Sequence, residues 1–470
     1  MKAEIKELKE LLEGVSAPRF FEFQMPSGKE LFLLILGLVV ITFPLWYAPL
    51  TPEFSAEVGL GDLNFYLFLL LLWVIPIHKA FPSKIQGVMR ELSNKNIEPQ
   101  VVHFNQGSGG RATEPSTATK KEGWLFSPPQ IDDWHPESPY KEDAAGLLAD
   151  HPNNIGTPVP STISMEMVVR MVGTVSIIMF SMTILRELSN LIAIGEAERE
   201  STVYAVISYM GLIAIFMLAG AFMEWKKIKT WRQTMDLPTS RIRSMAVGDV
   251  EVYGQLRPRI GWPSVVYVDG DIEKSAHGMA QWGWSYNQVS YWEEFVVKTD
   301  SEGNTTRTWE DRSRTVFVRG DAGFHQSMVH DGTGGCSIDH GLLEHHGSSL
   351  KRDWKRPDNS IYSGPRGMNI RSERAEHVWD LKGWSYGEPM FIHGVAESRP
   401  RAELEEEGVD MTIAPALIEI KNKKGVSFKP NVYRGTELLS LHDLKSPISA
   451  LTPNLVTAVA MILMLLTFVM

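Results

Sequence analysis

The chain has 470 residues, of which 44% are hydrophobic and 22% are charged, and its formal net charge is −10. Its single cysteine, Cys336, excludes disulfide bonds within the chain and any all-cysteine zinc or iron–sulfur centre. The acidic balance argues against a general nucleic-acid binder, which would carry a basic stripe, and long charge-free apolar runs argue against a soluble enzyme.

Five apolar runs are long enough to be membrane spans, since a span needs about 20 residues. After a cytoplasmic, amphipathic N-terminus (1–30), the expected spans are 31–50 and 59–77 (the hairpin 31–78), 165–187 and 203–223 (the hairpin 165–225), and 448–470. The sequence therefore predicts a multi-pass α-helical membrane protein with about five spans. Arg186 and Glu187 end the third span, and two interpretations stay open for them: charges at the interface or an intramembrane ion pair.

The loop charges predict the orientation of these spans. Lys226, Lys227 and Lys229 follow the fourth span, whereas the 51–63 loop has no lysine or arginine. Positive charges favour the cytoplasmic side. We therefore expect a plasma-membrane protein with a cytoplasmic large domain, an external C-terminus, and these three lysines in contact with lipid.

Residues 79–164 are predicted to form an acidic, flexible cytoplasmic loop. A Gly-, Ser- and Thr-rich stretch at 107–119 is typical of a linker. Three bulky aromatic residues follow, namely Trp124, Phe126 and Trp134. Two interpretations stay open: these aromatics dock a protein partner, or they pack on the large cytoplasmic domain.

The region 236–446 has the pattern of a mainly β domain. Residues 247–254 alternate with a period of two, and further strands are expected at 265–268, 289–297, 315–318, 389–395, 416–421 and 425–429. The segment 300–305 lies between aromatic-rich runs and predicts a long β-hairpin, and the Asp331-Gly332 pair predicts a tight turn. Many short strands favour a barrel- or sandwich-like fold.

The β region opens with the motif Pro238-Thr-Ser-Arg-Ile-Arg-Ser-Met-Ala-Val-Gly-Asp-Val-Glu-Val-Tyr-Gly254. This motif resembles the opening of the GIDE, or "beside a membrane" (BAM), domain family. The stretches at 331–339 and 389–396 are similar to later motifs of the family, so the resemblance covers about 236–450. It implies a membrane-proximal β domain with a binding or scaffolding role.

The best-known members of that family are MULAN-type membrane E3 ubiquitin ligases, in which a RING finger follows the last helix. A RING needs about eight Cys or His ligands for zinc, and this chain has one cysteine. The sequence therefore resembles a RING-less, prokaryotic-type member, and the ligase activity does not carry over.

Two arginines of the opening motif are candidates for lipid contact. Arg241 and Arg243 alternate with Ile242, which would place both on one face of a strand. Contact with anionic headgroups and a solvated or salt-bridged strand face are both open interpretations.

A cluster of titratable residues invites interpretation as chemistry. Weak candidates for a metal site are Cys336, His340, His345 and His346, and a hydrolase would have to use Asp321, His325, His330 and Asp331. A buried cysteine behaves as a small hydrophobic residue, and Asp331 is explained by the turn. We therefore expect no catalytic residues, no metal and no cofactor.

The expected function is that of a non-catalytic interaction or scaffold protein that presents the GIDE-like domain at the cytoplasmic membrane face. Its expected partners are the lipid bilayer and a protein of unknown identity, and not nucleic acid. Three alternatives stay open: a component of ubiquitin-like ligation, a hydrolase using the 321–346 cluster, and a transporter or channel subunit.

Overall fold

The computed structural model of the protein contains two compact units. One unit comprises 93–155 and 238–440, and the other comprises 2–92, 156–237 and 441–470. The structure describes residues 21–22, 101–106, 110–115, 123–129, 134, 139–156, 163–164, 199–236, 238–299, 305–345, 350–425, 429–436 and 448–469, with isolated positions between 167 and 185.

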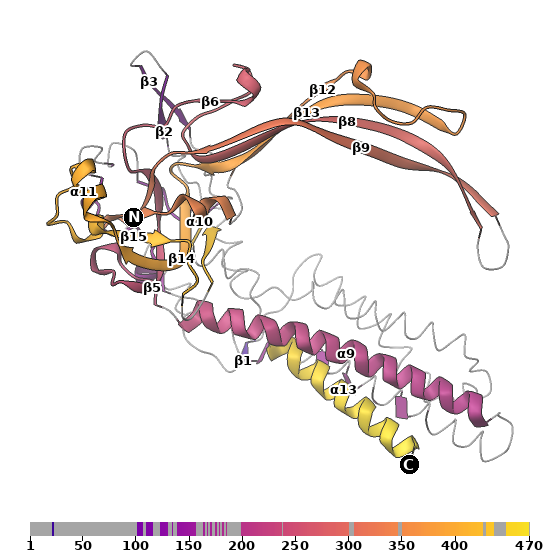
Figure 1. The fold of residues 1–470 in the computed structure, drawn as a ribbon. Helices are drawn as coiled ribbons and strands as arrows, with labels where there is room; N and C mark the ends of the chain where they lie inside the picture. Colours follow the sequence, from indigo (N-terminus) through magenta and orange to yellow (C-terminus); the bar gives the residue numbers. More distant parts are fainter. Residues whose placement is uncertain are drawn as a thin grey trace. The chain divides into compact units, whose positions relative to one another are not determined.

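A closed sheet forms one end of the first unit (Figure 1). Its strand order is β15-β11-β10-β5-β14-β16, and an additional pairing of β15 with β14 closes the ring of β5, β10, β11, β15 and β14. The strands are β5 (Gly248–Pro258), β10 (Ser327–His330), β11 (Gly335–Ile338), β14 (Pro389–Ser398), β15 (Ile418–Lys421) and β16 (Asn431–Arg434).

Apolar side chains from all sides of the closed sheet pack together in its interior. Val252, Leu256, Val329, Ile392 and Ile420 are completely buried there. Period-two alternation sends the other side chains of β5 to the outer surface of the sheet. That outer surface is where the polar residues described below are found.

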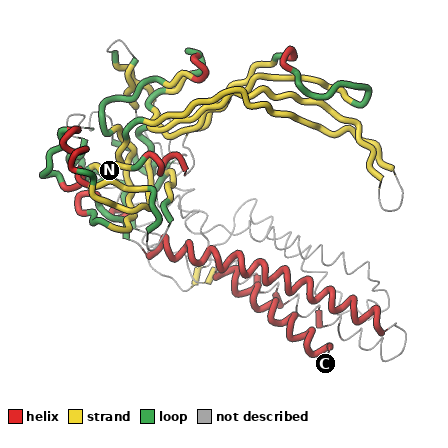
Figure 2. The backbone as a smooth tube through the Cα atoms, in the orientation of Figure 1, coloured by secondary structure: helices red, strands yellow, loops and turns green. Residues whose placement is uncertain are grey.

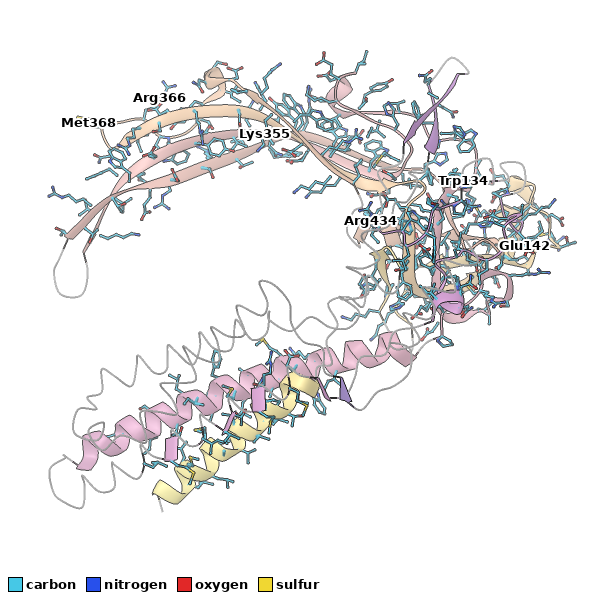
Figure 3. The ribbon with its side chains drawn as sticks, turned by 180° about the vertical axis from the view of Figure 1, so that it is seen from behind. Trp134, Glu142, Lys355, Arg366, Met368 and Arg434 are labelled. Atoms are coloured by element: carbon cyan, nitrogen blue, oxygen red, sulfur yellow. The ribbon has the colours of Figure 1, made fainter. Side chains whose placement is uncertain are left out.

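A second sheet extends from the closed sheet as a long curved ribbon, which we name the arm (Figures 1 and 2). Its strand order is β12-β13-β8-β9. The strands are β8 (Met279–Thr299), β9 (Thr305–Phe324), β12 (Leu350–Pro357) and β13 (Ile370–Ser385). Lys355 lies partway along the arm and Arg366 and Met368 lie toward its outer end, whereas Trp134 and Arg434 lie at the closed sheet (Figure 3).

Short elements complete the first unit. The hairpin β2–β3 is anchored by the Asn105 amide, which donates to Pro263 O at 2.7 Å. The elements are β2 (Val101–Asn105), β3 (Arg111–Pro115), α7 (Pro152–Ile155), η5 (Ile242–Ser244), β6 (Val266–Tyr267), η6 (Val268–Gly270), β7 (Ser275–Ala276), α10 (His340–His345), η7 (Asn359–Ile361), α11 (Arg401–Glu407) and η8 (Ala414–Leu417).

Two long helices, α9 (Arg199–Asp236) and α13 (Ile448–Val469), lie side by side in the second unit (Figure 1). Met210, Ala458 and Met461 are buried. Thr457 donates a hydrogen bond to Thr174 Oγ1 at 3.2 Å. The two-residue strands β1 (Phe21–Glu22) and β4 (Ile163–Ser164) pair in parallel.

The predicted five-span fold class requires correction. Within the described part of the chain, no helix combines the length and the apolar character that a membrane crossing needs. The multi-pass α-helical class and the plasma-membrane location with an external C-terminus are therefore corrected, because the described chain consists mainly of strands.

The individual spans have different outcomes. The runs 31–50 and 59–77 lie outside the described residues, and 165–187, with Arg186 and Glu187, is described only at isolated positions before Arg186. The run 203–223 lies within α9, which continues past it to Asp236.

Several predicted strands are found, and the long β-hairpin is confirmed: β8 and β9 pair from Thr299–Thr305 to Gln281–Phe324. The Asp331-Gly332 turn is also confirmed, because β10 and β11 flank it. The strand β12 (Leu350–Pro357) was not predicted from the sequence. This strand is held by backbone pairing with β13, from Leu350–Gly383 to Pro357–Glu376, and the local sequence pattern gives no sign of that pairing.

Candidate functional site

The predicted partner-docking aromatics lie inside the first unit. Trp124 is 2% exposed and donates from Nε1 to Gly387 O at 3.2 Å. Phe126 is also buried, and Trp134 stacks on Trp262 with ring centroids 6.3 Å apart. These three side chains are covered by other residues of the first unit, so they offer no free docking surface. Their positions agree with the alternative in which the aromatics pack on the β domain.

The acidic segment around these aromatics is fixed by side chains on the outer face of β5. Arg257 donates to both carboxylate oxygens of Asp143, at 2.8 and 2.6 Å. The carboxylate of Asp150 accepts the backbone N–H groups of Leu125 and Phe126 at 2.8 and 2.9 Å. Residues 123–129 and 139–156 are thus a built part of the β unit rather than a flexible loop.

Burial shifts two neighbouring groups of this segment in opposite senses. Loss of solvation raises the pKa of Asp150 to about 7, although the donated hydrogen bonds counteract the shift. Loss of solvation lowers the pKa of His151 to about 4, and the positive charge of the nearby Arg241 contributes a smaller part of this shift. His151 accepts the Asn153 N–H at Nδ1, which fits its neutral form.

A buried acid–histidine pair lies on the same outer face of the closed sheet. His393 Nε2 is 3.0 Å from Glu251, whose other carboxylate oxygen accepts the hydroxyl of Thr239 at 2.6 Å. All three residues are buried. The hydroxyl is bonded to the carboxylate and not to the imidazole, so this is not the order of a nucleophile–base–acid triad. The pair attaches the segment before η5 to the sheet.

The residues of the proposed hydrolase cluster do not converge. Asp321 is exposed on β9, and His325 bonds to the Tyr386 hydroxyl at 2.9 Å. His330 is buried, with Nε2 2.8 Å from Lys141 O. Asp331 accepts the Ile242 N–H at 2.8 Å, among other donors. Burial raises the pKa of Asp331, and its role is to hold the turn against η5.

The candidate metal ligands occupy unlike environments. Cys336 is completely buried, and burial raises the pKa of its thiol well above the ordinary range. His340 is exposed at the start of α10 and stacks on Phe324. The side chain of His345 and all of His346 lie outside the described residues. Among the residues described, no group of three or more His, Cys, Asp or Glu side chains is placed to hold a metal ion.

The candidate lipid-contacting residues are on two different elements. Arg243 lies in the 3₁₀ helix η5 and Arg241 is its N-cap, so the expected strand face is wrong. Arg243 pairs with Glu142 at 3.0 Å on the surface. Lys226 lies over the Phe222 ring on α9, at 4.5 Å from its centroid. Lys227 and Lys229 are also in α9, with side chains outside the described set.

A small pocket beside Trp134 holds two arginines that already have partners. It is lined by Trp134, Pro139, Arg257, Pro258, Arg259, Gly261, Trp262 and Met328. Arg259 donates to Gln326 and Ser337 at 2.6 and 2.9 Å, while Arg257 is paired with Asp143. The charges here are neutralised within the chain, so the pocket is a weak candidate for an anion site.

The two faces of the arm differ. On one face, Tyr286 stacks on Trp379 with centroids 5.0 Å apart, and Lys274 from the β6–β7 hairpin lies 4.3 Å from the Trp379 ring centroid. The hairpin residues Val266 and Ala276 are buried against this cluster. This face is therefore largely covered near the closed sheet.

The opposite face, which we name the Trp309 face, presents aromatic rings with arginines over them. Arg371 lies 4.2 Å from the centroid of Trp309, and Arg374 lies 5.0 Å from that of Tyr291. Phe295 meets Trp309 edge to face at 5.1 Å. Sequence reasoning missed this surface, because β13 brings its arginines to β8 and β9 from more than sixty residues away.

Comparison with known proteins adds no relative: no family model, curated protein or solved structure matches the chain.

Proposed function

We propose that this protein is a non-catalytic interaction protein that binds an acidic protein segment on the Trp309 face of the arm. The observation that carries the proposal is the position of Arg374, which is exposed, lies over Tyr291, and has no ion pair among the described residues. An arginine stacked on a ring keeps its N–H edge available for a carboxylate.

Neighbouring residues support an acidic partner. Arg307 is exposed on the same face, opposite Val297, and it too has no ion pair within the described chain. Arg371 is held in place by Glu293, to which it donates at 2.8 and 2.7 Å. The face thus combines aromatic rings with two exposed arginines, Arg307 and Arg374, that have no ion pair among the described residues. Aromatic residues and arginine are enriched at binding surfaces.

The resemblance to the GIDE family is consistent with a binding role and stays a prediction. A catalytic role has less support, because the titratable residues singled out above are buried in structural contacts or dispersed over the described chain. The buried thiol of Cys336 and the turn-forming Asp331 are the clearest cases.

The test is binding of a fluorescent glutamate-rich peptide to the full chain, measured by anisotropy. The double variant Arg307→Glu/Arg374→Glu is expected to weaken binding at least tenfold, since it reverses two charges at the face. The matched control is Lys351→Glu/Lys355→Glu, which makes the same charge change on β12. Equal losses in both variants, or no loss in the first, would contradict the proposal.

A further inference from the structure

The strand β9 is an unusually long free edge. It is the last strand of the arm sheet, is 20 residues long, and pairs with β8 alone among the described residues. Its side chains are exposed along most of its length. An edge of this kind presents a row of unpaired N–H and C=O groups, which is a template for another strand.

Two features that block strand edges, proline and an irregular register, are absent from the first two thirds of β9, and the charged side chains of this stretch include both signs. There is no proline between Thr305 and Phe324. The only irregularity against β8 lies between Tyr286 and Asn287, at the Val318 position of β9. From Thr305 to Phe317 the register is continuous, so this stretch is a regular strand with one side available.

The sequence of this stretch is complementary to itself in an antiparallel register centred on Arg312. A twofold axis through Arg312 would place Glu310 of each copy opposite the second copy's Arg314. Because that axis is perpendicular to the sheet, opposed residues stay on the same face. The same register places Trp309 opposite Thr315 and Thr308 opposite Val316, and pairs of both kinds stabilise sheets.

Neighbouring registers match less well. An axis through Asp311 also places Glu310 opposite the second copy's Arg312, but it opposes two Asp311 carboxylates that have no cationic partner among the described contacts. An axis through Ser313 opposes Arg312 with Arg314 twice. Like charges directly opposite each other destabilise a sheet. In the favoured register the two copies of Arg312 meet at the axis, but each is ion-paired with Glu294 and Glu310 of its own chain, at 3.3 and 2.9 Å.

We propose that two copies of this chain associate through their β9 strands, antiparallel and centred on Arg312, to give one continuous eight-stranded sheet. The groups that form the contact are the outer backbone edge of residues 305–317 and the reciprocal Glu310–Arg314 pairs. Glu310 is already bonded to Lys298 at 2.5 Å, so the second copy's Arg314 would extend an existing charge network. The proposed association does not rest on the peptide site, although Arg307 and Trp309 of β9 belong to both surfaces.

A single introduced cysteine tests the register. Two copies of Arg312→Cys would face each other at the axis, and opposed Cα atoms about 4.5 to 5.5 Å apart are within disulfide range. The native Cys336 is buried and gives no background. The control Thr306→Cys would place its two thiols roughly 40 Å apart at about 3.3 Å per residue. The register is supported if Arg312→Cys cross-links rapidly on oxidation and Thr306→Cys does not. It is overturned if Arg312→Cys gives no cross-link or if both variants cross-link equally.

Charge reversal tests the reciprocal pairs by sedimentation of the full chain. Glu310→Arg and Arg314→Glu are each expected to weaken dimerisation roughly tenfold, because each opposes like charges twice. The double variant is expected to restore the wild-type dimer, and Lys355→Glu on the other edge is expected to leave it unchanged. The proposal is overturned if the wild-type chain is still monomeric at roughly 100-fold the concentration used for cross-linking. It is also overturned if the double variant dimerises no more strongly than the single variants.

Discussion

Asp143 and Arg257 form an ion pair of two hydrogen bonds whose side chains are only 1% and 4% exposed. The two residues are 114 positions apart in the chain. The pair therefore attaches the acidic segment 139–156 to β5 of the closed sheet. Arg257 also donates from Nε to Gln255 at 2.8 Å, so its donors are matched within the fold.

Removing one partner of this pair is expected to be strongly destabilising. Asp143→Ala leaves a buried, unpaired guanidinium and should lower the free energy of unfolding by about 3–5 kcal/mol. The measurement is urea unfolding followed by circular dichroism. The control is Glu142→Ala, next to it, which breaks the exposed 3.0 Å pair with Arg243 and should cost less than about 1 kcal/mol. Similar losses in both variants would show that Asp143 does not anchor the segment.

The neighbours Asp150 and His151 are expected to give opposing pH dependences. The folded pKa of Asp150, about 7, lies above its ordinary value, so its contribution to stability is present at low pH and is lost as pH rises toward 7. The folded pKa of His151, about 4, lies below its ordinary value of 6.5, so its contribution is lost as pH falls from 6.5 toward 4.

The two slopes largely cancel in the wild-type chain between about pH 4.5 and 6.5, and single variants should separate them. In Asp150→Asn, unfolding free energy is expected to rise with pH across that window, by at most about 1.4 kcal/mol per unit. In His151→Gln it is expected to fall with pH. The check is urea unfolding at about pH 4.5, 5.5 and 6.5, and parallel pH profiles for both variants would refute the assignment.

Gly332 is expected to be irreplaceable. Its φ is +91°, and a Cβ there would lie 2.0 Å from Gly146 O of the acidic segment. Gly332→Ala should therefore cost more than about 2 kcal/mol, from backbone strain together with the clash. Gly270 has φ +74° with open space around it, so Gly270→Ala carries the strain alone. Thermal unfolding of both variants compares them; equal shifts would indicate that the contact with Gly146 is unimportant.

The thiol of Cys336 is expected to be unreactive in the folded chain. It is completely buried, its pKa is raised by burial, and it lies near Ser337 O and Ile418 O. Because the thiolate is the reactive form, a thiol reagent should label less than about a tenth of the chain in buffer and all of it in urea. Fast labelling of the native protein would argue for an accessible and functional cysteine.

How far the sequence predicts the fold depends on whether the decisive contacts are local. Aromatic-rich runs on both sides of 300–305 predicted the β8–β9 hairpin, and Asp331-Gly332 predicted a turn, because both signals come from neighbouring residues. The arginines over Trp309 and Tyr291 were missed, since β13 and β8 meet only through the tertiary fold. The membrane-span prediction also relied on a local signal, the apolar runs. Among the described residues, no helix has the length and apolar character of a span.

By itself, the sequence determined the single cysteine, the acidic balance, and several local strands and turns of the β region. Only the tertiary structure decided that the acidic segment is built into the closed sheet and that β9 is an edge. It also decided that His325, His330, Asp331 and Cys336 take part in different structural contacts. The physical reason is that charge and periodicity are properties of neighbouring residues, whereas burial, ion pairing and strand order depend on which distant segments the chain brings together.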